Sequence, residues 1–199
     1  VISVVSSDGS GKTTLTEALL FTAGAIDHFR PVDGGPPVLD TDPEERKRGF
    51  TLSSAIYQIN WKKKPLWVID TPGHAHYLWD TRNCVQISDC ALFVFNSTGA
   101  LKVEASRIWA FLKTMQVPTI VFINGMDLEE ADFNRVVEEV SNMDGGLLKL
   151  QLPLGKGKNF SGVVLVYDSA QAVWQNAEEN LFLKEKDTIS TQEEASAVI

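Results

Sequence analysis

The stretch VISVVSSDGSGKTTLTEALL, Val1 to Leu20, decides how this chain begins to fold. Its first six residues are short, β-branched and apolar, which is typical of a buried parallel strand. GKTT (Gly11–Thr14) is the core of the phosphate-binding pattern G-x-x-x-x-G-K-[ST], with Ser6 in place of the first glycine. A helix with one apolar stripe is predicted next, through Leu15, Ala18, Leu19 and Thr22. Strand, glycine-rich loop and helix in this order predict a cradle for phosphate groups.

The rest of the chain continues the alternation of strands and amphipathic helices. Further strands are predicted at 52–61, 65–70, 90–96 and 118–124. The helix after 90–96 has its apolar stripe at Leu101, Ala105, Ile108, Leu112 and Met115, and the helix after 118–124 has Phe133, Val136, Val137 and Val140. This order predicts an α/β fold of the P-loop NTPase type, a mostly parallel sheet flanked by helices with ligands at the carboxyl ends of its strands. The segment 24–49 is a long loop rich in glycine, proline and charge, and such loops are usually functional.

The glycine-rich loop carries the groups that a bound polyphosphate needs. The predicted nucleotide-binding residues of this loop are Gly9, Ser10, Gly11, Lys12, Thr13 and Thr14. Backbone N–H groups of the first four would form a nest at a helix N-terminus. The Lys12 ammonium would reach the β- and γ-phosphates, and the Thr13 hydroxyl would bind Mg²⁺.

Two further motifs follow predicted strands. In DTPGH (Asp70–His74), Asp70 can hold Mg²⁺ through water and the Gly73 amide can sense a γ-phosphate. In NGMD (Asn124–Asp127), Asp127 can accept hydrogen bonds from N1–H and the 2-amino group of guanine, which adenine does not offer. Each motif is weak alone, because Asp, Asn, Pro and Gly favour turns anyway. Behind a phosphate loop, in this order, they indicate the GTP-binding branch of the P-loop proteins.

A fourth motif closes the long loop and completes a family resemblance. RGFTLSS (Arg48–Ser54) places Thr51 where it could close over Mg²⁺ and the γ-phosphate. Together with TTLTEALLFTAGAID, DPEERKRGFTLSS, DTPGH, PTIVFIN and LQLPLGKGKNFSGVV, it resembles the translational GTPases, most closely bacterial elongation factor G and its paralogs. The resemblance runs from Val1 to about Trp174. In that family a small residue is tolerated at the position of Ser6.

The resemblance implies a domain that binds GTP or GDP with Mg²⁺ and hydrolyses GTP. Its partner would be the ribosome, at the factor-binding site and the stalk proteins, and hydrolysis would be slow without it. His74 would orient the attacking water, with Lys12 and Thr51 as further catalytic groups. The implied metal ligands are Thr13, Thr51 and, through water, Asp70. The implied nucleotide-binding residues outside the loop are Asp70, Gly73, Asn124 and Asp127.

The same resemblance implies a domain layout. Residues 1–145 would form the GTPase domain, and residues 146–199 would form part of an inserted α+β subdomain, called G′, with an acidic tail. The closing strand and helix, which carry the SA loop that contacts guanine in the family, are expected to be absent, and Ser169–Ala170 is expected to be a decoy. Because Val1 stands inside a predicted strand without a preceding methionine, we expect a fragment of a longer protein.

Two departures from the family pattern keep other functions open. Gly125 replaces a lysine whose stem lies on the guanine ring, so weak nucleotide binding is expected, and a lysine restored there should tighten GDP and GTP alike. His76 stands where the family usually has aspartate. One alternative is a nucleotide-binding paralog that switches without hydrolysis. Another is a ribosome-protection or release-factor GTPase, which shares the same motifs.

Composition excludes several other classes of function. The net charge is −8 and the pI about 4.9, which argues against a broadly basic, sequence-specific nucleic-acid-binding face. No apolar run approaches the roughly 18 residues of a membrane span. The two cysteines, Cys84 and Cys90, have no metal or redox spacing and are expected to be reduced thiols. We therefore expect a cytoplasmic protein without a membrane partner.

Overall fold

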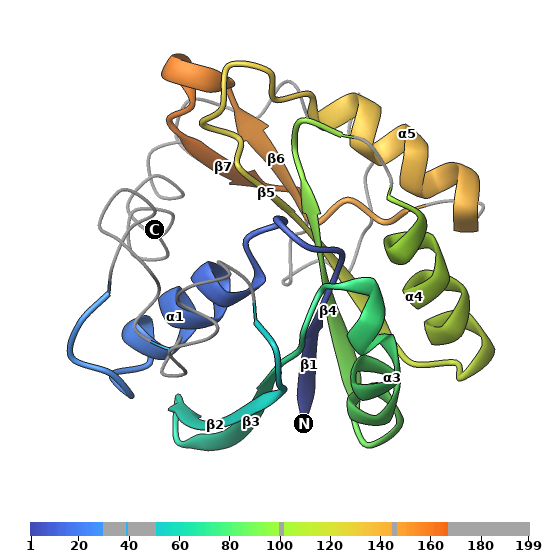
Figure 1. Ribbon diagram of the computed structural model, residues 1–199. Coiled ribbons are helices and arrows are strands. Elements are labelled where there is room, and N and C mark those ends of the chain that lie inside the picture. Colours follow the sequence, from blue (N-terminus) through green and yellow to red (C-terminus); the bar gives the residue numbers. More distant parts are fainter. Residues whose placement is uncertain (30–38, 40–50, 100–101, 145–146, 167–199) are drawn as a thin grey trace. The chain divides into compact units, whose positions relative to one another are not determined.

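The computed structural model of this 199-residue chain describes residues 1–29, 39, 51–99, 102–144 and 147–166 (Figure 1). The chain divides into two compact units, Val1–Asn96 with Ala100–Asn124, and Ser97–Gly99 with Gly125–Ile199. The elements of the first unit are β1 (Ile2–Val5), α1 (Lys12–Thr22), β2 (Ala55–Trp61), β3 (Lys64–Asp70), the 3-10 helix η2 (Ala75–Tyr77), α3 (Leu78–Gln86), β4 (Cys90–Asn96), α4 (Val103–Thr114) and β5 (Thr119–Asn124).

The first unit is built on one five-stranded sheet with the order β2-β3-β1-β4-β5. β1 pairs in parallel with β3 and β4, and β4 pairs in parallel with β5. Only β2 runs antiparallel, because it forms a hairpin with β3 through the turn at Lys62 and Lys63, both of which have positive φ. The predicted fold class, a mostly parallel α/β sheet flanked by helices, is confirmed. The carboxyl ends of β1, β3, β4 and β5 meet at one edge of this sheet.

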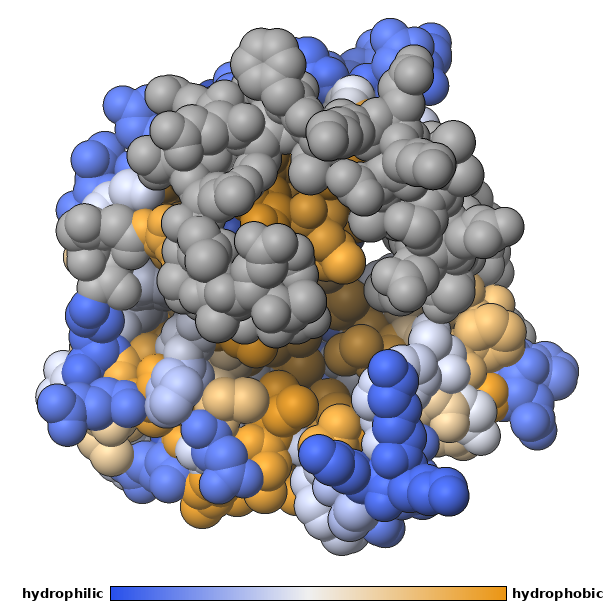
Figure 2. All heavy atoms as spheres, turned by 180° about the vertical axis from the view of Figure 1, so that it is seen from behind, coloured by the Kyte–Doolittle hydropathy of each residue, from blue (hydrophilic) through white to orange (hydrophobic). Residues whose placement is uncertain are grey.

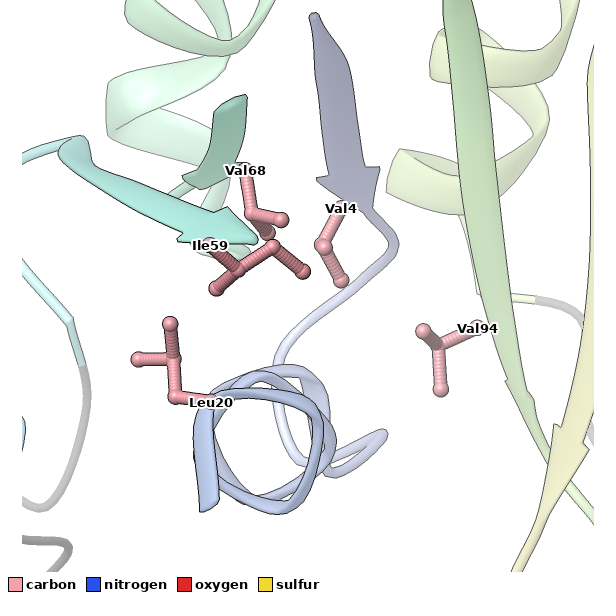
Figure 3. Close-up of a cluster of buried hydrophobic side chains, with 5 residues drawn as sticks. All are labelled: Val4, Leu20, Ile59, Val68 and Val94. Atoms are coloured by element: carbon pink, nitrogen blue, oxygen red, sulfur yellow. The ribbon is translucent and has the colours of Figure 1, made fainter. Parts of the chain in front are cut away.

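Helices cover both faces of the sheet, with α1 on one face and α3 and α4 on the other (Figure 1). On the α1 face, a buried cluster gathers one side chain from each of five elements (Figure 3). These are Val4, Leu20, Ile59, Val68 and Val94. On the opposite face, the Phe93 ring packs at 5.3 Å from the Trp109 ring of α4 and at 4.6 Å from the Phe95 ring. Because side chains alternate along a strand, β1 and β4 each contribute to both layers.

The buried stripe of α1 differs from the prediction. The helix buries Thr16, Glu17 and Leu20, whereas Thr22 is exposed. Leu15 packs against the core cluster as predicted. The difference arises because Thr16 and Glu17 are polar but lie on the buried face of α1. A prediction based on apolar residues does not identify them.

Two further local differences separate prediction and structure. β2 begins at Ala55, not at residue 52, and Lys64 belongs to β3. The short helix α3 was not predicted, because its only buried residues are Thr81 and Val85, one turn apart, which is too weak a pattern.

Several predictions fall outside the described residues. They concern residues 30–38 and 40–49 of the long loop, Leu101, Ser169–Ala170 and the tail 175–199.

The second unit holds α5 (Phe133–Asp144) and a two-stranded antiparallel sheet of β6 (Gln151–Leu154) and β7 (Gly162–Leu165), joined through the 3-10 helix η3 (Gly157–Asn159). Val136 and Val140 of α5 are buried, as the predicted stripe requires. The division into domains at residue 145 stays a prediction.

The described surface includes large hydrophobic side chains, and Figure 2 shows hydrophobic surface on the side that faces away from the viewer in Figure 1. On the edge strand β5, Ile120 and Phe122 are exposed; their register partners in β4 are Leu92 and Val94, so they lie on the α1 face. No helix in the described ranges is long and apolar enough to cross a membrane.

Candidate functional site

The glycine-rich loop connects β1 to α1 and is held by a neighbouring strand end. The Asn124 side-chain amide, at the end of β5, donates through Nδ2 to the Ser10 carbonyl oxygen at 3.1 Å. Gly11 caps α1 with a left-handed φ of 87°. A Cβ atom on Gly11 would collide with the Asn124 amide. Glycine is therefore required at this position by both the backbone conformation and the close approach.

The N-terminus of α1 presents backbone hydrogen-bond donors. The first N–H groups of an α-helix have no intrahelical acceptor, and no side chain in the described ranges caps α1. The Ser10 hydroxyl is buried and has no hydrogen-bond partner within the described part of the chain. Buried donors without acceptors are costly, and an anion at the helix N-terminus would satisfy them.

Lys12 adds a buried positive charge to the same loop. Its side chain is 6% exposed, and Nζ donates to the Ser7 carbonyl oxygen at 3.0 Å. Among the described residues, no carboxylate forms an ion pair with it. Burial lowers the pKa of Lys12, while the charges of Asp70 and Asp8 oppose that shift and the charge of Lys102 adds to it. A buried ammonium that is bonded to a carbonyl and not to a carboxylate favours a bound anion.

The three predicted metal ligands lie in the first unit, and two of them meet. Thr13 Oγ1 and Thr51 Oγ1 are hydrogen-bonded at 3.0 Å, although 38 residues separate them. Asp70 ends β3 with a buried carboxylate. Hydroxyl and carboxylate oxygens are the hard ligands that Mg²⁺ prefers, alongside substrate phosphates. The donor set fits a magnesium ion.

The segment after β3 is fastened to the sheet and to α3. The Thr71 hydroxyl donates to the Val4 carbonyl oxygen at 2.7 Å, and the Thr81 hydroxyl donates to the Pro72 carbonyl oxygen at 2.9 Å. These bonds bring Gly73 against the glycine-rich loop, where a Cβ atom would collide with Lys12 Nζ and with the loop backbone. The predicted γ-phosphate sensor therefore lies beside the predicted phosphate-binding lysine.

His74 follows at the N-cap of η2 and is partly buried. Its Nδ1 accepts the backbone N–H of His76 at 3.4 Å, and the two imidazole rings lie 4.8 Å apart. An accepting Nδ1 in a neutral imidazole leaves the proton on Nε2. The departure from the family pattern at His76 thus lies directly beside the predicted catalytic side chain.

Asp127 belongs to the second unit, where its turn is well held. The Gly125 carbonyl oxygen accepts from the Ser97 hydroxyl and from the Leu128 N–H, and the Met126 carbonyl oxygen accepts from Gly157 N at 2.9 Å. The Asp127 side chain is exposed, and its carboxylate has no partner within the described ranges. An exposed carboxylate on a fixed turn, without a partner in the described ranges, is suited to accept hydrogen bonds from a nucleotide base.

The comparison with protein families fits this geometry. The model of the elongation factor Tu GTP binding domain matches residues 1–174. This chain belongs to that family. Ribosome-releasing factor 2, mitochondrial, from Bos taurus is 35% identical over 174 residues, which is 87% of this chain and 22% of that protein. Elongation factor G 2 from Borreliella afzelii (strain PKo) is 31% identical over 164 residues, 82% of this chain and 24% of that protein.

A solved structure shows the same fold for this GTP-binding domain. A crystal structure of a protein from Thermus thermophilus superposes with a TM-score of 0.77 at 23% sequence identity, covering 99% of this chain and 30% of that one. The chain spans about a quarter of the length of the curated relatives it matches.

Sequence reasoning missed two side chains of this GTP-binding domain. Glu17 is buried in α1, and its Oε1 accepts the backbone N–H of Leu39 at 2.8 Å, which ties the helix to the long loop. Lys102 reaches the glycine-rich loop from the segment before α4. The local sequence marks neither side chain, because the partner of Glu17 is Leu39, 22 residues away, and the partner of Lys102 is Asp8, 94 residues away.

Gly125 has a conformation that bears on the expected effect of a lysine there. Its φ is +80°, and a Cβ atom would lie 3.0 Å from Leu128 Cδ1. A lysine stem on guanine would contribute roughly 1–2 kcal/mol, or about tenfold in affinity. A left-handed non-glycine residue costs about the same amount, and a turn that relaxes while the site is empty must recover this cost when the nucleotide binds.

We therefore expect Gly125→Lys to change the dissociation constants of GDP and GTP equally and by less than about threefold, with a lower melting temperature. The double variant Gly125→Lys, Leu128→Ala removes the crowding and should bind both nucleotides more tightly than the single variant. Calorimetric titration of both nucleotides checks this. Unequal effects on GDP and GTP would show that residue 125 does not act on the guanine end.

Proposed function

We propose that this chain is the GTP-binding and GTP-hydrolysing domain of a ribosome-dependent translation elongation factor of the elongation factor G kind. The observation that carries the proposal is that the glycine-rich loop gathers donors and a positive charge suited to an anion. Lys12 is a buried ammonium bonded to a backbone carbonyl, without an ion-pair partner among the described residues, and the buried Ser10 hydroxyl and the uncapped N-terminus of α1 adjoin it. Such a site is completed by a polyphosphate.

The other site residues take roles that their positions support. Mg²⁺ would be held by Thr13, Thr51 and, through water, Asp70, and when bound it supplies positive charge to the phosphates. Gly73 would donate its amide to the γ-phosphate. Asn124 holds the loop through Ser10, and Asp127 would pair with guanine.

For hydrolysis, we assign the orientation of the attacking water to His74. Phosphoryl transfer needs positioning more than covalent chemistry, so a partly buried imidazole beside the γ-phosphate sensor suits the task. The ribosome, through its factor-binding site and stalk proteins, would complete this arrangement, so hydrolysis without ribosomes should be slow. The compartment would be the cytoplasm, or the mitochondrion as in the Bos taurus relative.

A second candidate comes from the names of the relatives and is not favoured over the first. The ribosome-releasing factor 2 of Bos taurus matches at 35% identity, against 31% for the elongation factor G 2 of Borreliella afzelii. In this second candidate the domain belongs to a factor that acts in ribosome release, with the same nucleotide chemistry. A switch without hydrolysis is less favoured, because one unit retains Lys12, Thr13, Thr51, Asp70 and His74 together.

The experiment that tests the nucleotide assignment compares GDP with ADP by calorimetry in Mg²⁺ buffer. A site built for paired hydrogen bonds rejects the wrong partner strongly, so GDP should bind at least about 100-fold more tightly than ADP. The variant Asp127→Asn keeps the shape of the side chain but replaces one acceptor by a donor, and it should abolish most of this preference. Equal affinities for the two nucleotides in the parent chain would overturn the assignment.

A further inference from the structure

A second lysine reaches the glycine-rich loop from a distant part of the chain. Lys102 lies immediately before α4, and its Nζ donates to the Asp8 carbonyl oxygen at 2.6 Å across 94 residues of sequence. The same nitrogen lies 3.9 Å from the position that a Cβ atom on Gly9 would take. Gly9 and Asp8 are part of the loop proposed to hold phosphates, so Lys102 Nζ stands at that loop.

The charge of Lys102 is not neutralised by the described part of the chain. The Asp8 carbonyl is its one hydrogen-bond partner there, and no described carboxylate forms an ion pair with it. One bond uses one of three ammonium protons, and the side chain is exposed. Lys102 therefore places a second ammonium group at the loop, without an ion pair to a described carboxylate.

Lys102 and Lys12 are close enough to affect each other. The charge of Lys102 contributes to lowering the pKa of Lys12. Two like charges at one loop repel each other, and a polyanion bound between them would remove that repulsion. The charges of Asp70 and Asp8 offset part of this repulsion, and a polyanion between the two ammonium groups would offset more of it.

The position of Gly73 shows which end of the loop Lys102 approaches. A Cβ atom on Gly73 would lie 2.8 Å from the backbone N of Asp8, and Lys102 donates to the carbonyl oxygen of that same residue. The γ-phosphate sensor and Lys102 thus approach one residue of the loop. The other end of the loop runs into α1.

We propose that Lys102 is a second phosphate-binding cation of this site, which contacts the terminal phosphate of GTP and so favours GTP over GDP. This inference rests on the proposed function. Lys12 serves both nucleotides, whereas Lys102 serves the phosphate that only GTP carries.

The test compares three variants of the full chain, each titrated with GDP and with a non-hydrolysable GTP analogue in Mg²⁺ buffer at low and high salt. Lys102→Gln keeps a hydrogen-bond donor without the charge. Lys102→Arg keeps both. Lys113→Gln makes the same charge change in the last turn of α4 and is the matched control.

We expect Lys102→Gln to weaken binding of the GTP analogue about tenfold and GDP less than about twofold, as loss of one charge-assisted contact predicts. The effect of Lys102→Gln on binding of the GTP analogue should be smaller at high salt, because salt screens charge interactions. Lys102→Arg and Lys113→Gln should bind both nucleotides as the parent does.

Equal weakening of both nucleotides by Lys102→Gln would mean that the lysine only shapes the loop, and it overturns the inference, as does unchanged binding of both. Either result leaves the proposed function standing if the parent still prefers GDP to ADP. A parent chain that binds neither guanine nucleotide overturns the proposed function and this inference together. Melting temperatures of the nucleotide-free variants show whether each one is folded.

Discussion

Lys12→Met is expected to abolish measurable binding of GDP and GTP and, at the same time, to raise the melting temperature of the nucleotide-free protein. Binding should weaken by about 10²–10⁴-fold, because charged hydrogen bonds to two phosphates are lost at roughly 1.5–3 kcal/mol each. Stability should rise because the buried ammonium, whose pKa is lowered by burial, is replaced by an apolar chain of similar length. The replacement removes the desolvation cost of a buried ammonium that has no ion-pair partner among the described residues.

Scanning calorimetry and nucleotide titration of the same preparation check both parts of this prediction. Lys113→Met removes a lysine outside the loop and should leave nucleotide binding unchanged. A lower melting temperature for Lys12→Met would show that the contact of Lys12 with the Ser7 carbonyl stabilises the empty loop. Retained GTP binding would contradict the assignment of Lys12 to the phosphates.

His74→Ala is expected to reduce ribosome-stimulated GTP hydrolysis by about 10²–10⁴-fold while GTP still binds. The side chain belongs to the segment after Gly73 and not to the loop that would hold the nucleotide, so its loss should affect the reaction and not the ground-state complex. Single-turnover release of phosphate by the whole protein with ribosomes measures the rate. Titration with a GTP analogue measures the affinity.

His76→Ala is the matched control, since the backbone N–H that donates to His74 Nδ1 remains. It should cost less than about tenfold in rate. If His74→Ala hydrolyses GTP at the parental rate, another group orients the water. If the two variants lose rate equally, the pair of imidazoles acts as one unit and His74 has no separate role.

The phosphate loop was predictable from the sequence because its motif is local. Gly9 and Gly11 supply the positive φ angles, and the strand and the helix flank them within one short stretch. The contacts that Asn124 and Lys102 make with this loop come from distant parts of the chain, and that stretch alone does not predict them. The strands were predictable for a similar reason, since β4 and β5 are continuous apolar runs. The motifs at Asp70 and Asn124 were also predicted to lie at strand ends, and they do.

The buried face of α1 was not predictable in the same way. An apolar stripe through Leu19 and Thr22 was expected, whereas Thr16 and Glu17 are buried. Glu17 gains a partner only because Leu39 comes back over the helix. The burial of the Glu17 carboxylate therefore depends on its contact with Leu39, 22 residues away, which the sequence around Glu17 does not predict.

By itself, the sequence determined the family, the order of strands and helices, and the residue types that a nucleotide site needs. The tertiary structure alone decided which of these residues meet. Gly73 lies against Lys12, and Lys102 reaches Asp8, because parallel pairing of β1 with β3 and β4 brings their carboxyl ends to one edge. Thr13 contacts Thr51 because the antiparallel pairing of β2 with β3 places the start of β2 beside the end of β3, at the same edge. Local conformation follows from short-range sterics and hydrogen bonding, but contacts across 38 or 94 residues follow from sheet order and register, which pack the whole core at once.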